Sequence, residues 1–303
     1  MVKSMQESKG DKMFLLGTYV YLCMALVVVL YPLIYILSAS ISSPQAVNSG
    51  QMWLFPKDIT WAGYELVFNN PKIWNGYLNT IIYTVVGTLL NLAVTLPAAY
   101  ALSRSDFVGR NWFMGFILLT MFFSGGLVPT YLVVKNLGLI DTMGALILPV
   151  AASVWNIVVA RTFFQSTIPK ELQEAAHIDG CTNIKLFWKI VLPLSAPIIA
   201  VMALFYGVGH WNSYFSSLIY LNSESKYPLQ MVLRQILVLQ EMSAEMNGAG
   251  VSGEVAQAMN SKAETASLIK YGVIVVSTLP IIAVYPFLQR YFVQGVMIGS
   301  VKG

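Results

Sequence analysis

The sequence predicts an all-α integral membrane protein with six transmembrane helices. Of its 303 residues, 56% are apolar and only 11% are charged, whereas a soluble domain carries about 25% charged residues. The mean hydropathy is positive. Six charge-poor stretches are each long enough to cross the hydrocarbon core, which takes about 20 helical residues. The whole chain, residues 1–303, is therefore expected to form a single transmembrane domain.

The predicted spans follow one another along the chain, and their ends are approximate. They cover residues 13–39, 73–103, 111–134, 142–160, 190–220 and 271–289. Lys3, Lys9 and Lys12 precede the first stretch, as they would in a signal peptide. Its apolar run is too long for a signal sequence, and no clear small-residue cleavage site ends it. We therefore expect the first stretch to remain as an uncleaved span.

The placement of lysine and arginine predicts the orientation in the membrane, because cytoplasmic loops are enriched in both. One set of segments carries Lys3, Lys9, Lys12, Arg104, Arg110, Arg161, Lys170, Lys185, Lys189, Arg290 and Lys302. The other set, spread over much longer loops, carries Lys57, Lys72, Lys135, Lys226, Arg234, Lys262 and Lys270. The first set is expected to be cytoplasmic, which places both termini and residues 161–189 inside.

Two long loops are then expected outside. Residues 40–72 contain several prolines and tryptophans and are predicted to be structured. The loop at 221–270 shows helical periodicity over residues 229–237 and a glycine-rich, flexible break over residues 247–253. These loops suit a surface that receives a solute-binding protein. Ordinary loops between spans fit the same sequence, because length alone does not separate the two interpretations.

Prolines in every predicted span suggest irregular helices. Proline frees a backbone carbonyl, which is tolerated where that carbonyl faces a cavity or a neighbouring helix. The clearest break is Phe123–Pro129, at the outer end of the third span. A gate or re-entrant turn is one interpretation of this stretch, and a simple helix end is the one we favour.

Residues 161–189 form the only sizeable run of mixed charge between two long apolar segments. Pro169 suits the first turn of a helix, and Ser166 or Thr167 is the candidate cap of that start. Gly180 suits the left-handed conformation that ends a helix. Residues 169–179 are therefore predicted to form a helix of about three turns, which is too short to cross a bilayer. A second helix is expected to follow, capped by Thr182.

The predicted short helix has a face of small residues. Leu172, Ala175 and Ala176 share this face at i, i+3 and i+4 spacing, while the side chains of Glu171, Glu174 and His177 lie near or beside it. Small residues flanked by carboxylates suit close docking into the groove of a partner protein. A solvated helix–turn–helix loop is the alternative that the same residues allow.

Several motifs in the chain resemble a known family. Glu174-Ala175-Ala176, Asp179-Gly180, Ile190 and Leu192-Pro193 resemble the cytoplasmic EAA loop of ABC-importer permeases. Cys181 departs from the small residues that are usual at its position. The stretches 122–126, 211–215 and 285–303 resemble the same binding-protein-dependent carbohydrate importers, of the type I, maltose-importer-like group. They are most similar to the branch that imports complex oligosaccharides such as alginate or pectin fragments.

The resemblance implies a six-span permease subunit in the bacterial inner membrane. Its EAA loop would be the coupling helix that sits in a cleft of the ATPase, which assigns the coupling role to Glu171, Glu174, Ala175, Ala176, His177, Asp179 and Gly180. The implied partners are a second homologous permease chain, two ATP-binding cassette subunits that bind ATP and Mg, an extracytoplasmic solute-binding protein and an oligosaccharide. We see no internal repeat, so a symmetric transport unit needs that second chain. No cofactor is expected in this chain itself.

The stretch 210–217 is the most polar part of any predicted span. Polar groups at membrane depth usually face a bundle interior or an aqueous path, and aromatic rings beside hydrogen-bonding groups suit a sugar. The candidates for a substrate pathway are Trp155, Asn156, His210, Trp211, Asn212 and Tyr214, with Asn79 and Asn91 as weaker ones. The alternative is an interfacial aromatic belt in which Ser and Asn join neighbouring helices.

Other functions find less support in the sequence. The chain has no G-x-x-x-x-G-K-[ST] loop, so it is not expected to hydrolyse ATP. Its two histidines stand on different segments without zinc-site spacing, and no basic stripe suggests nucleic acid. An ion-gradient-driven secondary transporter usually carries buried acids in its spans, and the predicted spans contain no Asp or Glu. An intramembrane enzyme that uses His210 would lack a nearby acid or nucleophile.

Overall fold

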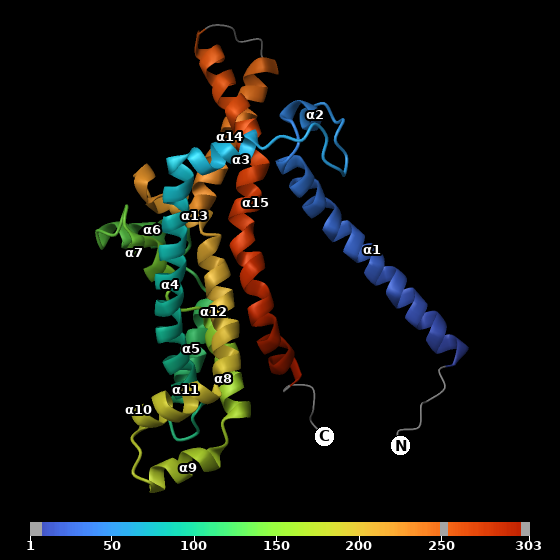
Figure 1. The fold of residues 1–303 in the computed structure, drawn as a ribbon. Coiled ribbons are helices and arrows are strands. Elements are labelled where there is room, and N and C mark those ends of the chain that lie inside the picture. The colour runs from blue at the N-terminus through green and yellow to red at the C-terminus, as the bar shows by residue number, and fades with distance from the viewer. Residues whose placement is uncertain (1–7, 249–253, 298–303) are drawn as a thin grey trace. The chain divides into compact units, whose positions relative to one another are not determined.

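The computed structural model of this chain describes residues 8–248 and 254–297 (Figure 1). These residues form helices joined by short loops, and no β-strand occurs among them. The elements are α1 (Lys9–Ser40), α2 (Pro44–Asn48), α3 (Ala62–Asn69), α4 (Pro71–Ser103), α5 (Arg110–Phe122), α6 (Leu127–Asn136), α7 (Met143–Ile147), η1 (Leu148–Val150), α8 (Val154–Thr167), α9 (Lys170–Ile178), α10 (Asn183–Leu186), the π-helical turn η2 (Phe187–Val191), α11 (Leu192–Leu194), α12 (Ala196–Trp211), α13 (Tyr214–Tyr220), η3 (Glu224–Lys226), α14 (Leu229–Gly248) and α15 (Glu254–Met297). The predicted all-α class is confirmed.

The chain divides into two compact units. One unit comprises the residues up to Asn70 together with Gln235–Val276, and the other comprises Pro71–Arg234 together with the residues from Ser277 onward. In the first unit, the end of α1 is tied to the following loop, where Ser38 Oγ donates to the Leu54 carbonyl at 2.6 Å and Tyr64 Oη donates to Ser40 Oγ at 2.9 Å. The loop at 40–72 is thus structured, as predicted, and contains α2 and α3.

Three helices are long and apolar enough to cross a membrane, namely Lys9–Ser40, Pro71–Ser103 and the segment Thr265–Val284 of α15. Three further pairs of segments are long and apolar enough only when the two members are taken together, and each pair is bent. The bend is 112° between α5 and α6, 51° between Met143–Val150 and α8, and 82° between Asn183–Leu194 and α12. By length and composition the described residues therefore allow up to six spans. The stretches 111–134, 142–160 and 190–220 are each broken, as the prolines in them suggested. The bend between α5 and α6 is that of a broken span or re-entrant turn, so the simple helix end that we favoured for Phe123–Pro129 was wrong.

The break before α12 has a clear chemical cause. Pro197 lies in the first turn of α12 and has no N–H to donate, so one helical hydrogen bond is missing there and a bend is favoured. Ser195 lies at the bend, fully buried, and its hydroxyl donates to the Val191 carbonyl at 2.7 Å. The third predicted span breaks at the expected stretch, because α5 ends at Phe122 and Gly126 adopts a positive φ of 84° before α6.

The core of the second unit lies around α4, which packs against α8 and α12 (Figure 1). The helices α9, α10 and α11 lie at one end of this unit, and α6, α7 and α13 lie toward the other (Figure 1). The helix predicted over residues 229–237 is present as the first part of α14. The flexible break predicted over residues 247–253 falls mostly on residues 249–253, which lie outside the described residues.

Candidate functional site

The predicted short helix is present as α9, Lys170–Ile178, one residue shorter at each end than expected. Pro169 is its N-cap and has an extended backbone conformation. The expected caps Ser166 and Thr167 were wrong, because both belong to the last turn of α8. The Ser166 hydroxyl instead donates to the Phe163 carbonyl of its own helix at 3.1 Å.

The C-terminal end of α9 is a Schellman motif, as Gly180 predicted. Gly180 has a φ of 69°, its N–H donates to the His177 carbonyl at 3.0 Å, and the Cys181 N–H donates to the Ala176 carbonyl at 2.8 Å. Cys181 is half-buried and packs against the same core cluster as Ala176. This apolar contact commonly accompanies the motif, and it gives Cys181 a structural role at its position.

The face of α9 that points away from the protein differs from the one we expected. Ala176 is only 6% exposed and lies in the protein's own core, with Leu172 packed against the same cluster. The exposed face is formed by Glu171, Glu174, Ala175 and Ile178, at i, i+3, i+4 and i+7 spacing. Leu172 and Ala176 therefore anchor the helix, and Ala175 alone of the small residues remains on the surface.

The remaining residues assigned to coupling are exposed. His177 Nδ1 lies 3.2 Å from the Gln173 carbonyl of its own helix, and Asp179 is the C-cap. The outward face of α9 and its C-terminal end thus present the carboxylates of Glu171, Glu174 and Asp179. Such a surface complements a basic groove on a partner protein.

The segment after α9 leads directly into the membrane-spanning part. Thr182 caps α10 as predicted, and its hydroxyl accepts from the Lys185 N–H at 3.3 Å. Leu186 and Phe187 then enter the buried cluster that also holds Ala176. The α9–α10 hairpin, residues 169–186, is therefore joined by core packing to the helices above it.

A loop between α4 and α5 lies beside this hairpin, and we did not predict its role. Arg104, at the end of α4, is only 8% exposed and is paired with Asp106 through Nε at 2.8 Å and through Nη2. This guanidinium holds the pKa of the Asp106 carboxyl below its usual range. Residues 104–106 line an open gap of about 330 Å³ together with one edge of α9, where the exposed Glu174 and Ile178 border it beside Lys170, Gln173 and His177. An arginine two residues before an aspartate, directly after a predicted span, is the signal that could have pointed to this pair.

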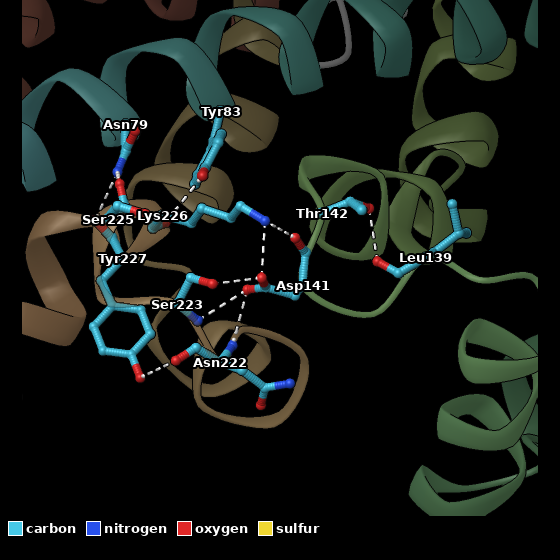
Figure 2. Close-up of polar contacts among 10 residues, drawn as sticks. All are labelled: Asn79, Tyr83, Leu139, Asp141, Thr142, Asn222, Ser223, Ser225, Lys226 and Tyr227. Carbon is cyan, nitrogen blue, oxygen red and sulfur yellow. Dashed lines mark hydrogen bonds and ion pairs between the residues drawn. The ribbon is translucent and has the colours of Figure 1, made fainter.

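At the other end of the second unit, Asp141 joins two loops (Figure 2). Its carboxylate accepts from the N–H groups of Asn222 and Ser223, both at 3.0 Å, from Ser223 Oγ at 2.6 Å and from Lys226 Nζ at 2.8 Å. The Lys226 ammonium, followed by the Ser223 hydroxyl, holds the pKa of Asp141 well below its usual range. Asp141 has a positive φ of 59°, which is uncommon for a residue other than glycine.

Side chains in the first half of α4 donate hydrogen bonds to the backbone carbonyls of residues 225–227, which follow the two residues whose backbone N–H groups donate to Asp141. Asn79 Nδ2 donates to the carbonyls of Ser225 at 2.8 Å and Tyr227 at 3.1 Å, and Tyr83 Oη donates to that of Lys226 at 2.9 Å (Figure 2). Asn79, a weaker pathway candidate, therefore uses its amide to join α4 to this segment. We call the contacts of Asp141, residues 222–227 and α4 the Asp141 junction.

The pathway candidates on α12 make internal hydrogen bonds. His210 Nε2 lies 2.6 Å from Asn91 Oδ1, and Asn91 Nδ2 donates to the Val150 carbonyl at 2.6 Å. The Asn91 amide thereby provides a hydrogen-bond donor for the Val150 carbonyl, which lies at the break before α8. Trp211 is buried, and its Nε1 donates to the Ser277 carbonyl at 3.0 Å. These contacts match the alternative in which polar groups join neighbouring helices.

The other pathway candidates differ in exposure and are not gathered into one cluster by any of these hydrogen bonds. Trp155 is 59% exposed, whereas Asn156 beside it is buried. Asn212 is exposed and is the C-cap of α12, where its Nδ2 donates to the Val208 carbonyl at 3.0 Å. Tyr214 is half-buried at the start of α13. Their role in a substrate pathway stays a prediction.

Comparison with known proteins identifies relatives over nearly the whole chain. Protein LplC of Bacillus subtilis (strain 168) is 42% identical over 302 residues, which cover 100% of this chain and 99% of LplC. The polygalacturonan/rhamnogalacturonan transport system permease protein YtcP of the same organism is 39% identical over 293 residues, covering 97% of this chain and 99% of YtcP.

A solved structure has the same fold. The crystal structure of a bacterial ABC transporter involved in the import of the acidic polysaccharide alginate contains a chain that is 35% identical to this one, with a TM-score of 0.83. The match covers 95% of this chain and 100% of that chain. A family model described as "binding-protein-dependent transport system inner membrane component" matches residues 2–298. The chain therefore belongs to the family of inner membrane components of binding-protein-dependent transport systems.

Proposed function

We propose that this chain is one of two permease subunits of an ATP-driven importer that carries an oligosaccharide into the cytoplasm. A solute-binding protein would deliver the sugar from outside. The observation that carries this proposal is the geometry of α9, a short helix that is anchored by Leu172 and Ala176 and presents a separate acidic face. Family membership and the alginate-transporter structure support the same function.

The exposed face of α9 would dock into a cytoplasmic ATPase subunit. Glu171, Glu174, Ala175 and Ile178 would form the contact, with His177, Asp179 and Gly180 at its C-terminal side. Ala175 allows the partner surface to approach closely, and the large exposed Ile178 offers an apolar anchor at 86% exposure. Two copies of the ATPase would bind ATP and Mg, one through this helix and one through the matching helix of a second homologous permease chain.

The predicted orientation agrees with the arrangement of the second unit. The α4–α5 loop and the α9–α10 hairpin lie close together, and both belong to the lysine- and arginine-rich set assigned to the cytoplasm. The Asp141 junction joins loops that were all assigned to the outside. We accordingly propose an inner-membrane permease with both termini in the cytoplasm.

We propose that the substrate is an acidic oligosaccharide. One relative is named for polygalacturonan and rhamnogalacturonan transport, and the structural relative is involved in alginate import. The polymers in both names contain acidic sugars. Trp155, Asn156, His210, Trp211, Asn212 and Tyr214 remain the proposed pathway residues. Trp155 and Asn212 are the ones among them whose side chains are exposed.

Transport in this family would proceed by alternating access. ATP would close the ATPase dimer, move the coupling helices together and open the permease pair to the binding protein. Release of ADP and phosphate would reverse the movement. An ion-gradient-driven transporter was the alternative, and the family to which the chain belongs does not support it.

The test is reconstitution of the purified complex in vesicles, with the binding protein added on the side opposite to ATP. Oligogalacturonate and alginate oligosaccharides should be taken up only with ATP, and they should stimulate ATP hydrolysis. A neutral oligosaccharide of equal length serves as the control for charge. Uptake that follows an ion gradient without ATP would contradict the proposal, and equal uptake of the neutral sugar would contradict the acidic substrate.

A further inference from the structure

Arg104 is a buried charged side chain at the end of α4, next to the proposed coupling hairpin. Besides its bidentate pairing with Asp106, its Nη1 donates to Tyr100 Oη at 3.2 Å. The guanidinium also lies over the Tyr100 ring, 5.9 Å from its centroid. A forked arginine contact fixes direction as well as distance, so Arg104 holds Tyr100 and the start of the α4–α5 loop in one arrangement.

Tyr100 is in turn one of the contacts between α4 and the elements that carry the hairpin. Its ring centroid lies 5.2 Å from that of Phe187 and 5.7 Å from that of Phe164 in α8. Phe187 begins the π-helical turn η2 immediately after α10, and π-helical turns occur frequently at functional sites. Arg161 of α8 adds a further tie, since its Nε donates to the Leu102 carbonyl at 3.0 Å.

The α4–α5 loop itself is not packed tightly against the hairpin. A gap of about 330 Å³ separates residues 104–106 from α9, and one of about 550 Å³ lies between residues 97–108 and the Asn183–Phe187 segment. In contrast, Ala176, Leu186, Phe187 and Tyr100 belong to one buried cluster. Within this cluster, Phe187 and Tyr100 form a direct ring contact between the segment that follows the hairpin and α4.

We propose that Arg104 is a positioning residue for coupling, which locks Tyr100 so that movement of the α9–α10 hairpin is passed through Phe187 to α4. This inference rests on the proposed function. When the ATPase displaces the hairpin, Phe187 presses on the Tyr100 ring. Because the guanidinium holds the Tyr100 hydroxyl and Asp106 together, the ring cannot slide, and α4 moves with the hairpin. The helix α4 also contacts α8 and α12 and reaches the Asp141 junction at its other end.

The test is Arg104→Gln in the reconstituted complex, with the ratio of sugar transported to ATP hydrolysed as the readout. We expect the ATPase to remain bound and active while this ratio falls about fivefold or more, the lower end of typical coupling between sites. Arg110→Gln is the matched control. It removes the guanidinium at the first residue of α5, which donates to the Arg104 carbonyl at 3.0 Å but does not contact the Tyr100 hydroxyl or Asp106, and it should leave the ratio unchanged.

Tyr100→Phe separates positioning from folding, because it keeps the ring and removes only the hydroxyl that Arg104 holds. It should lower the ratio in the same way, and combining it with Arg104→Gln should add little further loss, because both changes break one contact. A lower yield of complex with a normal ratio would show that Arg104 serves folding only, and would overturn the inference. If the complex with Arg104→Gln transports sugar at a normal ratio of sugar to ATP, the inference is also overturned, but the proposed function stands. A wild-type chain that binds no ATPase would overturn both.

Discussion

Replacement of Gly180 by valine should loosen the α9–α10 hairpin through backbone strain alone. Gly180 has a φ of 69°, and a Cβ built on it meets no atom within 4 Å. No clash is therefore added, and the cost is that of placing a β-branched residue in the left-handed region. An L-residue pays about 1–2 kcal/mol there, and valine lies at the upper end because its branch restricts the backbone further.

If the left-handed conformation is abandoned instead, the Schellman motif is lost. The hydrogen bonds from Gly180 to His177 and from Cys181 to Ala176 would then break, at a net cost of about 0.5–1.5 kcal/mol each. Either route destabilises the folded hairpin by about 1–3 kcal/mol. A destabilisation of about 1–2 kcal/mol already corresponds to a factor of about 5–30 in the population of the open form.

Limited trypsin digestion of the purified permease measures this opening, because cleavage follows the population of the open form when reclosing is fast. Mass spectrometry identifies the cuts at Lys170 and Lys185, which are exposed on the hairpin. Gly180→Val should be cleaved about 5–30-fold faster than wild type, and Gly180→Asn much less so, because asparagine tolerates the left-handed region. Gly17→Val in α1, where an added Cβ also meets nothing within 4 Å, is the control. Wild-type cleavage of Gly180→Val would refute the reasoning.

Three further predictions concern the rest of the chain. Single cysteines at Ser105 and Asn136 should react with an impermeant maleimide from opposite sides of the membrane, Ser105 from inside, and same-side labelling would reject the orientation. The lowered pKa of Asp141 makes its contribution to stability complete at neutral pH and lost progressively as the pH falls below the unfolded value of about 3.9. Asp141→Asn should therefore lower the melting temperature at pH 7 and flatten its decline below about pH 4, whereas an unchanged acid profile would contradict the junction's role. His210→Ala should reduce the yield of folded permease because it leaves a buried partner unpaired, whereas Asn212→Ala should keep assembly and reduce uptake, and the reverse pattern would contradict these assignments.

Cap chemistry made the hairpin predictable from sequence. Gly180 and Thr182 have local roles that need no tertiary partner, so both ends of α9 fall within one residue of expectation and α10 begins after the predicted cap. The inward face of α9 could not be predicted in this way. Ala175 and Ala176 are chemically identical neighbours, and only tertiary packing in the cluster that includes Leu186 and Phe187 buries one and exposes the other.

Contacts between distant segments were the main features missed. Pairing of Arg104 with Asp106 is local, but its contact with Phe187 through Tyr100 depends on how α4 meets η2. Asp141 gave no sequence signal for its positive φ or for its partners more than 80 residues away. Polarity marked His210 as unusual from the sequence, whereas the contact between its side chain and that of Asn91 could be identified only from the structure.

The central claim is that the outward face of α9 docks into the ATPase, and Ala175→Trp tests it most directly. Ala175 is exposed, so the bulky ring should leave the permease folded and paired with the second permease chain. The ATPase should be lost on purification, and ATP-dependent uptake in vesicles should fail with it. Ala176→Trp is the matched control, because this alanine is only 6% exposed and its replacement should instead destabilise the permease itself through overpacking. If Ala175→Trp retains the ATPase and transports at the wild-type rate, α9 is not the coupling element.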